Sequence, residues 1–204
     1  MSLSQELGIS GPPAETRAAY RMRSIALTVG AISPRSKRDL TGLWGGGPSG
    51  SIVFMVNVNR MLSLGVGLDA SVLQFRDDAA QTRFSDRSTY PDSAYPATSI
   101  RLFNIFMAWK FAPLPQGRFS PYVAADIGAV LRSDASYRPV VDEIRYTYYS
   151  IPGRTRLSIG GGVGVDMGVS RTVAIELELR AKYLQQDPAF GVCAVVRGGV
   201  RISV

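Results

Sequence analysis

The sequence predicts an all-β protein in which eight antiparallel strands, each paired with the next along the chain, close into an up-and-down barrel. Three observations lead to this prediction. From residue 24 onward, apolar side chains recur at every second position, which is the period of a β-strand. Turn residues interrupt this alternation at regular intervals. The runs between them are roughly 9 to 14 residues long, longer than the ~5 to 6 residues usual in soluble sheets.

The first three strands are predicted at residues 24–33, 50–58 and 61–75. In each strand one parity is apolar and the other is small or polar. The apolar residues are Ile25, Leu27, Val29 and Ala31, then Ile52, Phe54, Val56 and Val58, then Leu62, Leu64, Val66, Leu68, Ala70 and Val72. A loop rich in Gly, Arg and Lys precedes the second strand, whereas a tight turn at Asn59 and Arg60 precedes the third.

The fourth and fifth strands are predicted at residues 98–111 and 119–132, after a long polar segment. Their apolar parities hold Phe103, Ile105, Met107, Trp109 and Phe111, then Phe119, Val123, Ala125, Ile127, Ala129 and Leu131. Arg101 shares the apolar parity near the start of the fourth strand, while Asn104 and Lys110 lie on its opposite face. The short segment PLPQGR joins the two strands.

The last three strands are predicted at residues 155–167, 172–184 and 192–204, after a second long segment, 133–154. The turn GVSR joins the sixth strand to the seventh, and LQQDPAFG joins the seventh to the eighth. The seventh strand carries Val173, Ile175, Leu177, Leu179, Ala181 and Tyr183 on one parity and Glu176, Glu178, Arg180 and Lys182 on the other. Long connections therefore alternate with short ones along the whole chain.

The residues of the polar parity indicate which face of the barrel points inward. They include many glycines, alanines and serines beside the charges, although glycine weakens a strand that is exposed to water. Small residues suit the narrow interior of an eight-stranded barrel, where they leave room for large charged side chains. We therefore predict a polar lumen and a lipid-facing apolar exterior, which makes this a transmembrane β-barrel whose strand lengths match the ~9 to 11 residues needed to cross a bilayer.

The predicted lumen contains five acids and four bases, a charge balance that favours ion pairing. This lumen charge network consists of Asp69, Asp126, Asp166, Glu176, Glu178, Arg180, Lys182, Arg197 and Arg201. An unpaired charge in a dry lumen costs several kcal/mol. We therefore expect a network of salt bridges that plugs the lumen instead of a continuous pore.

Composition limits the functions that this chain can perform. It has 204 residues, no histidine and a single cysteine, Cys193. The missing histidine removes the usual general base and the commonest metal ligand, so we expect no enzymatic activity, cofactor or metal. The net charge of +7 is scattered and accompanies no RNA-reading motif, so we expect no nucleic-acid partner.

Aromatic residues mark two further features. Residues near strand ends are candidates for the aromatic girdles of a membrane barrel: Phe75, Trp109, Phe111, Phe119 and Tyr183. The segment 133–154 holds four tyrosines among several arginines, and these are candidate contacts to a partner: Tyr137, Tyr146, Tyr148 and Tyr149. The alternative for this segment is an ordered extension of the hairpin above the membrane.

The two ends of the chain differ from the barrel itself. We expect residues 1–23 to form a flexible N-terminal extension, followed by the barrel domain at residues 24–204. The N-terminal residues lack the charged start, apolar run and cleavage site of a secretory signal, so we expect these residues not to be a signal peptide. No run of 18 apolar residues occurs, which argues against a membrane-spanning helix.

The segments FSPYVAADIGAVL and LSIGGGVGVDMGVSRTVAIELELRAKYL resemble the small outer-membrane β-barrel family, eight-stranded barrels like the OmpA membrane domain and OmpX. The resemblance covers residues 24–204, although family members usually end on an aromatic residue and this chain ends on Val204. It implies a bacterial outer-membrane protein with a structural or surface-interaction role. Its expected partners are membrane lipid, including lipopolysaccharide, and an unknown protein bound by the long loops.

Two alternatives make different demands on the same residues. A soluble calyx-type barrel that binds an apolar small molecule requires the apolar parity to point inward. An enzyme that uses a carboxylate pair requires Glu176 and Glu178 to be available for proton transfer, whereas a structural role has them paired with Arg180 and Lys182.

Overall fold

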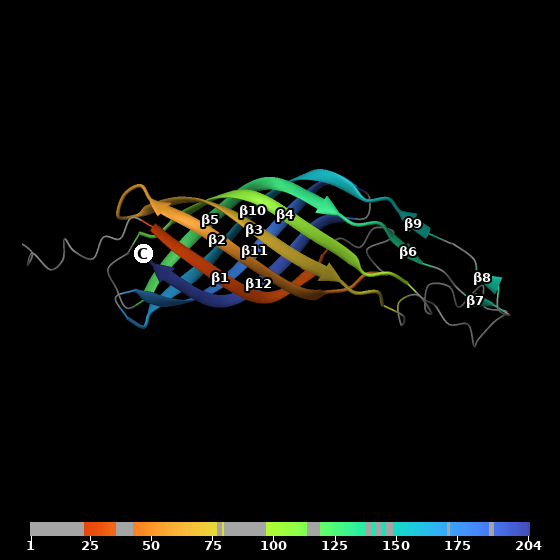
Figure 1. The fold of residues 1–204 in the computed structure, drawn as a ribbon, viewed down its shortest axis with the longest axis horizontal. Helices are drawn as coiled ribbons and strands as arrows, with labels where there is room; N and C mark the ends of the chain where they lie inside the picture. The colour runs from red at the N-terminus through yellow and green to blue at the C-terminus, as the bar shows by residue number, and fades with distance from the viewer. Residues whose placement is uncertain are drawn as a thin grey trace, which may run out of the picture.

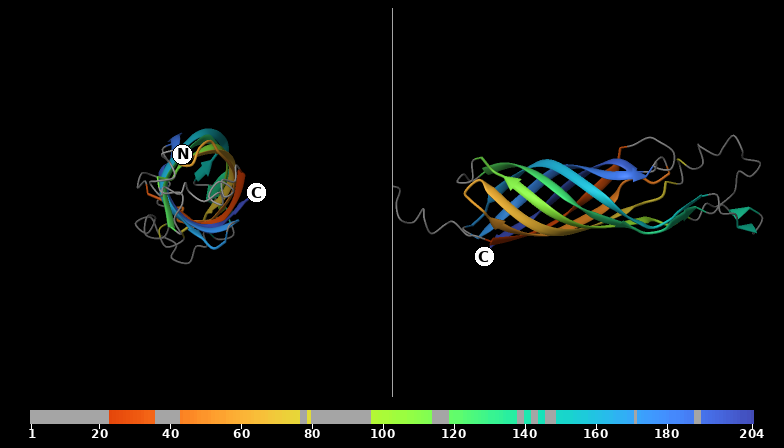
Figure 2. Two further views of the ribbon diagram at one scale, coloured as in Figure 1. Left: turned by 90° about the vertical axis from the view of Figure 1, so that its left-hand side faces the viewer. Right: turned by 90° about the horizontal axis from the view of Figure 1, so that it is seen from above.

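Eight long strands wind obliquely into one closed barrel (Figure 1), which is a ring when viewed along its axis (Figure 2). The structure, a computed structural model, describes residues 23–35, 43–76, 79, 97–113, 119–137, 140–141, 144–145, 149–170, 172–187 and 190–204. Every barrel strand is antiparallel to both of its neighbours, and the first pairs with the last. The closed sheet therefore has no free edge, and the predicted eight-stranded up-and-down architecture is confirmed.

The barrel strands follow the chain in order around the ring. They are β1 (Arg23–Pro34), β2 (Gly47–Asn57), β3 (Leu62–Leu73), β4 (Ile100–Phe111), β5 (Phe119–Arg132), β10 (Arg154–Gly168), β11 (Val173–Asp187) and β12 (Phe190–Ser203).

Most predicted strand bounds agree with the structure, but the last connection does not. The segment LQQDPAFG was expected to be a loop because it is polar and contains a proline. Instead, β11 continues to Asp187 and β12 begins at Phe190, and these two residues pair. The register is irregular between Tyr183 and Asp187. The prediction of a long connection here is wrong because strand pairing rests on backbone hydrogen bonds, which polar side chains do not prevent.

Four short strands lie within the segment between β5 and β10, where the sequence predicts a long loop. β6 (Ala135–Tyr137) pairs with β9 (Tyr149–Ile151), and β7 (Val140–Val141) pairs with β8 (Ile144–Arg145). Both pairs lie beyond the end of the barrel (Figure 1). The alternative of an ordered hairpin extension therefore describes the paired part of this segment. In the described part of the chain, no helix has the length and apolar character needed to span a membrane.

The two ends of the barrel differ in their connections. The turn end holds the short connections from β2 to β3, from β4 to β5 and from β10 to β11, and the C-terminus lies there (Figure 1). The predicted turn at Asn59 is confirmed, because its Oδ1 accepts hydrogen bonds from the backbone amides of Met61 and Leu62, each at 2.8 Å. The opposite end, from which β6 and β9 extend, is called the loop end.

The apolar parity faces outward on all eight strands. On β11, the exposed fractions of Ile175, Leu177 and Leu179 are 41%, 47% and 52%, whereas those of Glu176 and Glu178 are 6% and 7%. This arrangement is the reverse of a soluble barrel, which packs its apolar parity inside. It also contradicts the geometry that the calyx alternative requires.

These outward side chains form an apolar belt around the barrel. Its largest members are Ile25, Leu27, Val29, Ile52, Phe54, Val56, Leu64, Val66, Leu68, Phe103, Ile105, Met107, Trp109, Phe111, Phe119, Val123, Ile127, Leu131, Leu157, Ile159, Val163, Ile175, Leu177, Leu179, Tyr183, Val192, Val196, Val200 and Ile202. Four of the five predicted girdle aromatics belong to it, Trp109, Phe111, Phe119 and Tyr183.

Glycines on the inward parity make space for the large lumen side chains, as the sequence predicts. A Cβ on Gly67 would collide with the ring of Phe106, and a Cβ on Gly164 would collide with the ring of Tyr122. Two further glycines make space for charged side chains: Gly160 for Asp126 and Gly162 for Arg180. The narrow interior therefore pairs large side chains with glycines on neighbouring strands.

An apolar cap fills the lumen at the loop end. It consists of Ile32, Leu43, Trp44, Leu73, Ile100, Leu102, Val130, Ala135, Leu184, Cys193 and Val195, with Phe75 and Ala97 against it. The Trp44 Nε1 donates a hydrogen bond to the Thr98 carbonyl at 3.0 Å. The Trp44 and Phe75 rings pack edge to face, with their centroids 5.4 Å apart. The girdle prediction for Phe75 is therefore wrong, because Phe75 shares the inward parity of Leu73 and packs against the cap.

Candidate functional site

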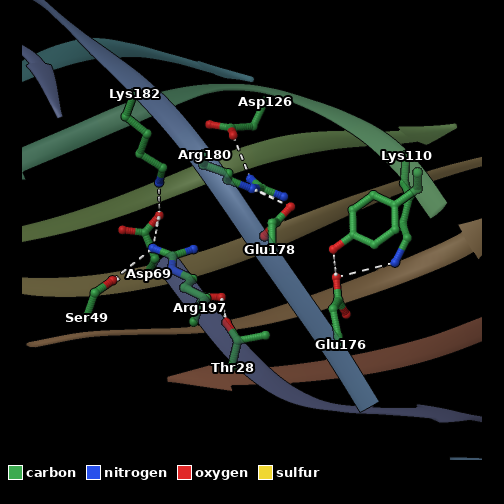
Figure 3. Close-up of polar contacts among 12 residues, drawn as sticks. Thr28, Ser49, Asp69, Lys110, Asp126, Glu176, Glu178, Arg180, Lys182 and Arg197 are labelled. Carbon is green, nitrogen blue, oxygen red and sulfur yellow. Dashed lines mark hydrogen bonds and ion pairs between the residues drawn. The ribbon is translucent and has the colours of Figure 1, made fainter. Parts of the chain in front are cut away.

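The predicted lumen charges come together inside the barrel, one layer above another along β11 (Figure 3). Glu176, Glu178, Arg180 and Lys182 occupy alternate positions of that strand, and all four are buried. Because alternate residues of a strand point to the same side, β11 lines the lumen with these charges from the turn end toward the loop end. Their contacts form three clusters, and the middle one contains both Glu178 and Arg180.

The cluster nearest the turn end is built around Lys110. Its Nζ lies 2.9 Å from Asp166 Oδ2 and 3.3 Å from Glu176 Oε1, and it also lies 3.6 Å from the centroid of the Tyr122 ring. Tyr122 Oη donates a hydrogen bond to Glu176 Oε1 at 2.6 Å. Arg201 Nη2 lies 2.8 Å from Asp166 Oδ2. Each acid of this cluster is therefore neutralised by a base, and both bases contact Asp166.

The middle cluster places Arg180 between two acids. Its Nη1 lies 2.6 Å from Asp126 Oδ2, and its Nε lies 2.7 Å from Glu178 Oε1. The guanidinium carbon also lies 6.0 Å from the centroid of the Phe106 ring, and Lys182 Nζ lies 5.1 Å from the same centroid. The negative face of an aromatic ring attracts cations, so the Phe106 ring favours the positive charge of both groups.

The cluster nearest the loop end converges on Asp69. The Lys182 Nζ is hydrogen-bonded to its Oδ2, Asn104 Nδ2 donates to the same oxygen at 3.2 Å, and Arg197 Nη2 lies 3.7 Å away. Arg197 also donates to Ser49 Oγ, from Nη2 at 3.0 Å and from Nε at 3.3 Å. The single carboxylate of Asp69 thus serves two buried cations.

These contacts tie together strands that are not neighbours in the sheet. β11 and β3 lie four positions apart in the ring of eight, so the pair Lys182 and Asp69 spans the lumen from wall to opposite wall. Lys110 on β4 reaches Glu176 on β11, three positions away. Ion pairs between distant strands add cross-links that the backbone ladder lacks, provided that each charge keeps its partner.

The structure places the nine predicted residues of the lumen charge network in the barrel interior, together with further polar residues. Eight of the nine predicted charges are buried, and Arg201 is partly exposed near the turn end. Six further polar residues of the network were not predicted: Ser49, Ser71, Asn104, Lys110, Tyr122 and Ser158. Their inward parity is readable from the sequence. With Lys110 included, the ion-pair network among the described residues contains five acids and five bases.

Two small cavities border these clusters in the described part of the barrel. One cavity of about 10 Å³ borders Asp69, Asn104 and Lys182, and another of about 20 Å³ borders Glu176 and Glu178. A volume of this size accommodates roughly one water molecule. Within the described residues, no group of three or more Cys, Asp or Glu side chains is arranged to hold a metal ion.

The four candidate tyrosines of the loop lie beyond the barrel end or outside the described residues. Tyr137 on β6 and Tyr149 on β9 are cross-strand partners, so the backbone brings these two positions together. Tyr146 and Tyr148 fall outside the described residues. Their role as loop contacts stays a prediction.

Comparison with known proteins supplies relatives at the level of the fold. No protein-family model matches the chain, and no curated protein matches its sequence. Solved structures do match. Neisserial surface protein A aligns at 16% identity and a TM-score of 0.54, covering 90% of this chain and 97% of that one.

Two further structures have the same architecture. A major outer membrane protein from Thermus thermophilus aligns at 11% identity with a TM-score of 0.57, covering 88% of this chain and 98% of that one. The outer membrane protein OprG from Pseudomonas aeruginosa aligns at 11% identity with a TM-score of 0.50, covering 89% and 92%. The resemblance to small outer-membrane β-barrels is therefore confirmed for the fold.

Proposed function

We propose that this protein is a non-enzymatic β-barrel of the bacterial outer membrane, with a plugged polar lumen and a structural or surface-interaction role. The apolar belt carries this proposal. Contiguous exposed apolar patches on soluble monomers rarely exceed a few hundred Å², whereas this belt includes side chains from all eight strands. Surrounding lipid removes that surface from water.

The closed backbone suits the same environment. A bilayer core offers no water to satisfy free amide and carbonyl groups, so a spanning sheet must have no unpaired edge. Here β1 pairs with β12 over eleven residue pairs, from Ser24 with Ser203 to Pro34 with Cys193. The barrel can therefore be surrounded by lipid without leaving a ladder of unpaired groups.

The lengths of the connections support an orientation. In outer-membrane barrels the short turns face the periplasm and the longer loops face the outside. The turn end of this chain would then lie at the periplasmic surface, and the loop end with β6 to β9 at the cell surface. This orientation places the segment 133–154 where it can contact a partner protein or the sugar and phosphate groups of lipopolysaccharide.

The contents of the lumen support a plug. Lys182 and Asp69 join opposite walls, and the apolar cap lies between this pair and the loop end. An ion that entered from outside would first have to cross the apolar cap and would then meet a bridge of side chains, both of which oppose its passage. A structural or surface role suits such a barrel better than conduction.

The arrangement of Glu176 and Glu178 favours a structural role over the enzyme alternative. Glu176 contacts Lys110 and Tyr122, and Glu178 contacts Arg180. These partners are themselves parts of the ion-pair network. Proton transfer to a substrate would require a carboxylate within hydrogen-bond reach of that substrate, whereas both carboxylates lie inside a packed lumen.

A folding assay in detergent tests the proposal. We expect the refolded chain to stay in solution only with detergent or lipid, and to migrate on a gel at one position when unheated and at another after boiling. The boiled sample serves as the unfolded control. A chain that is folded and monomeric in buffer without detergent would contradict the membrane location.

A further inference from the structure

The short connections at the turn end have a one-sided charge. The three that join β2 to β3, β4 to β5 and β10 to β11 each contain one arginine, and none contains an acidic residue. The three long connections, residues 35–46, 74–99 and 133–153, together contain eight bases and eight acids. The unbalanced positive charge of the connections is therefore confined to the turn end.

The other charges that adjoin the turn end leave it positive. Residues 1–22, which precede β1, contain two acids and two arginines, so they balance. The terminal carboxylate of Val204 adds one negative charge, and Arg23, the first residue of β1, adds one positive charge. The lumen acids at this end, Asp166 and Glu176, already have basic partners inside the barrel. The three turn arginines therefore leave a net charge of about +3, because arginine stays protonated in proteins.

Two arginines of the turn end are described outside the lumen, Arg23 and Arg60. Both are exposed. The ion pairs within the described part of the chain include neither of them. The arginines of the other two turns, Arg118 and Arg171, fall outside the described residues, and the site argued below does not include them. Arg23 and Arg60 thus offer positive charge to an external anion.

Both arginines can be reached from outside the barrel wall. Arg23 lies on the outward parity of β1, directly opposite Val56 on β2, and Val56 belongs to the apolar belt. Arg60 is exposed in the turn that joins β2 to β3, beyond the end of the wall. Lipid headgroups that surround the wall can therefore contact these side chains without entering the lumen.

Exposed apolar residues flank Arg60 on both sides. Val58, two positions before it, has an exposed fraction of 57%, and Met61, directly after it, has an exposed fraction of 47%. A cation among exposed apolar side chains suits the interface between membrane and water, where the apolar groups stay near the hydrocarbon and the guanidinium reaches the headgroups. A soluble anion would leave both apolar side chains in water, so this arrangement favours a lipid headgroup.

We propose that Arg23 and Arg60 bind the phosphate groups of anionic phospholipids at the turn end of the barrel. The planar guanidinium presents forked donors that match phosphate oxygens in pairs, and basic residues beside a membrane surface attract anionic lipids. This site rests on the proposed membrane location and specifies the class of lipid at one end of the barrel. The lipopolysaccharide contacts proposed above concern the opposite end.

Trp109 lies close to this site and serves as the reporter. It is on the outward face of β4, and three residues later the amide of Ala112 donates a hydrogen bond to the Met61 carbonyl at 2.7 Å. The chain has two tryptophans, so a Trp44→Phe background leaves Trp109 as the only one. Bromine on a lipid acyl chain quenches tryptophan fluorescence on contact. The quenching of Trp109 therefore measures which lipids occupy this part of the wall.

The test uses vesicles of phosphatidylcholine that contain about one-tenth phosphatidylglycerol, enough to make the surface anionic. Bromine is carried either by the phosphatidylglycerol or by an equal amount of the phosphatidylcholine, so the surface charge is the same in both samples. We expect brominated phosphatidylglycerol to quench Trp109 at least about twofold more than brominated phosphatidylcholine. The double variant Arg23→Gln, Arg60→Gln should lower this ratio to about one, because the attraction of the two cations is lost.

The matched control is Arg101→Gln, Arg154→Gln, which removes the same charge from two exposed residues at the loop end. Arg101 and Trp109 lie on the same strand, separated by ~27 Å at ~3.4 Å per residue, which exceeds the Debye length of roughly 8 Å. The control should therefore keep the ratio of the unmodified protein. A ratio of one for the unmodified protein, or an equal fall in both double variants, would overturn the site.

Two further measurements separate this site from the membrane proposal and from soluble anions. Flotation with the vesicles and a heat-induced gel shift verify that each variant is inserted and folded. An inserted barrel without lipid preference contradicts this site alone, whereas a chain that does not float contradicts the membrane location as well. Replacement of chloride by inorganic phosphate at equal ionic strength should leave the ratio unchanged. A ratio that falls to one in phosphate would overturn the assignment to lipid.

Discussion

Asp69 is the single carboxylate that serves two buried cations, Lys182 and Arg197, and it also accepts a hydrogen bond from Asn104. We expect Asp69→Asn to lower the free energy of unfolding by about 3 kcal/mol, because it leaves buried positive charge without compensation. Urea titration of the barrel in lipid vesicles, followed by tryptophan fluorescence, measures this change.

Arg201→Gln is the control variant for Asp69→Asn. Arg201 pairs with Asp166, but its side chain is 23% exposed and Lys110 still neutralises the acid after the change. The expected loss of stability is below about 1 kcal/mol, since a partly solvated pair contributes little. If the two variants lose equal stability, burial is not what makes the Asp69 contacts strong.

A substitution at Gly67 tests whether glycines in the lumen are needed to make space for large side chains on neighbouring strands. A Cβ at this position would collide with the Phe106 ring, so Gly67→Ala should destabilise the barrel by about 1 to 3 kcal/mol through overpacking. Gly161→Ala is the matched control, because a Cβ on this outward-facing glycine meets only the Ala124 carbonyl oxygen, at 3.8 Å.

The expected effect of the control variant is neutral or slightly stabilising, since alanine reduces the freedom of the unfolded chain. The same urea titration compares the two variants. A neutral Gly67→Ala would show that Phe106 has room to shift, and it would contradict the tight packing of glycine against ring.

At the scale of the strands, the sequence predicts which face a side chain occupies when that residue belongs to an alternating run. The alternation in β11 was sufficient to orient Glu176 and Leu177 correctly, because a strand has only two faces and the opposite parity carries glycine and charge throughout the chain. Lys110 was missed as a network member although its parity indicates the lumen, since it stands among apolar neighbours in β4.

The apolar cap could not be predicted from such alternation. Leu43 and Trp44 lie in an irregular segment before β2, and their burial depends on Leu73 and Phe75, some thirty residues away. Contacts of this kind are set by closure of the barrel and leave no local periodicity.

Chemical labelling of a Trp44→Ala variant tests whether the apolar cap seals the lumen. Cys193 is a free thiol with an exposed fraction of 1% within the cap. We expect a membrane-impermeant maleimide to label Cys193 slowly, and Trp44→Ala to raise the labelling rate at least about tenfold, because deletion of the indole leaves a cavity at the loop end.

Phe54→Ala provides the control for this labelling experiment, because Phe54 is also a large aromatic residue but lies on the outward face of β2. Its labelling rate should equal that of the unmodified protein. Rapid labelling of the unmodified protein, or no acceleration by Trp44→Ala, would mean that the cap does not close this end of the lumen.

At the scale of the whole molecule, the inside and outside of the barrel exchange character along its axis. Over the middle, charges are inside and apolar side chains are outside. At the loop end, the apolar cap is inside, and the outward parity of β4 passes from Phe103 to the exposed Arg101. A barrel that crosses a bilayer and projects beyond it requires this change, because its surroundings change from lipid to water.

Spin labelling in lipid vesicles tests most directly whether the apolar belt contacts lipid. Labels are placed at Val66 on β3 and Leu177 on β11, which lie on opposite walls, and at the exposed turn residue Asn59, each in a Cys193→Ser background. We predict that the two belt labels collide readily with molecular oxygen and rarely with a water-soluble nickel complex, and that Asn59 shows the reverse. Belt labels that are shielded from both reagents, as in a packed core, or accessible to nickel, as at a water-exposed surface, would contradict the account.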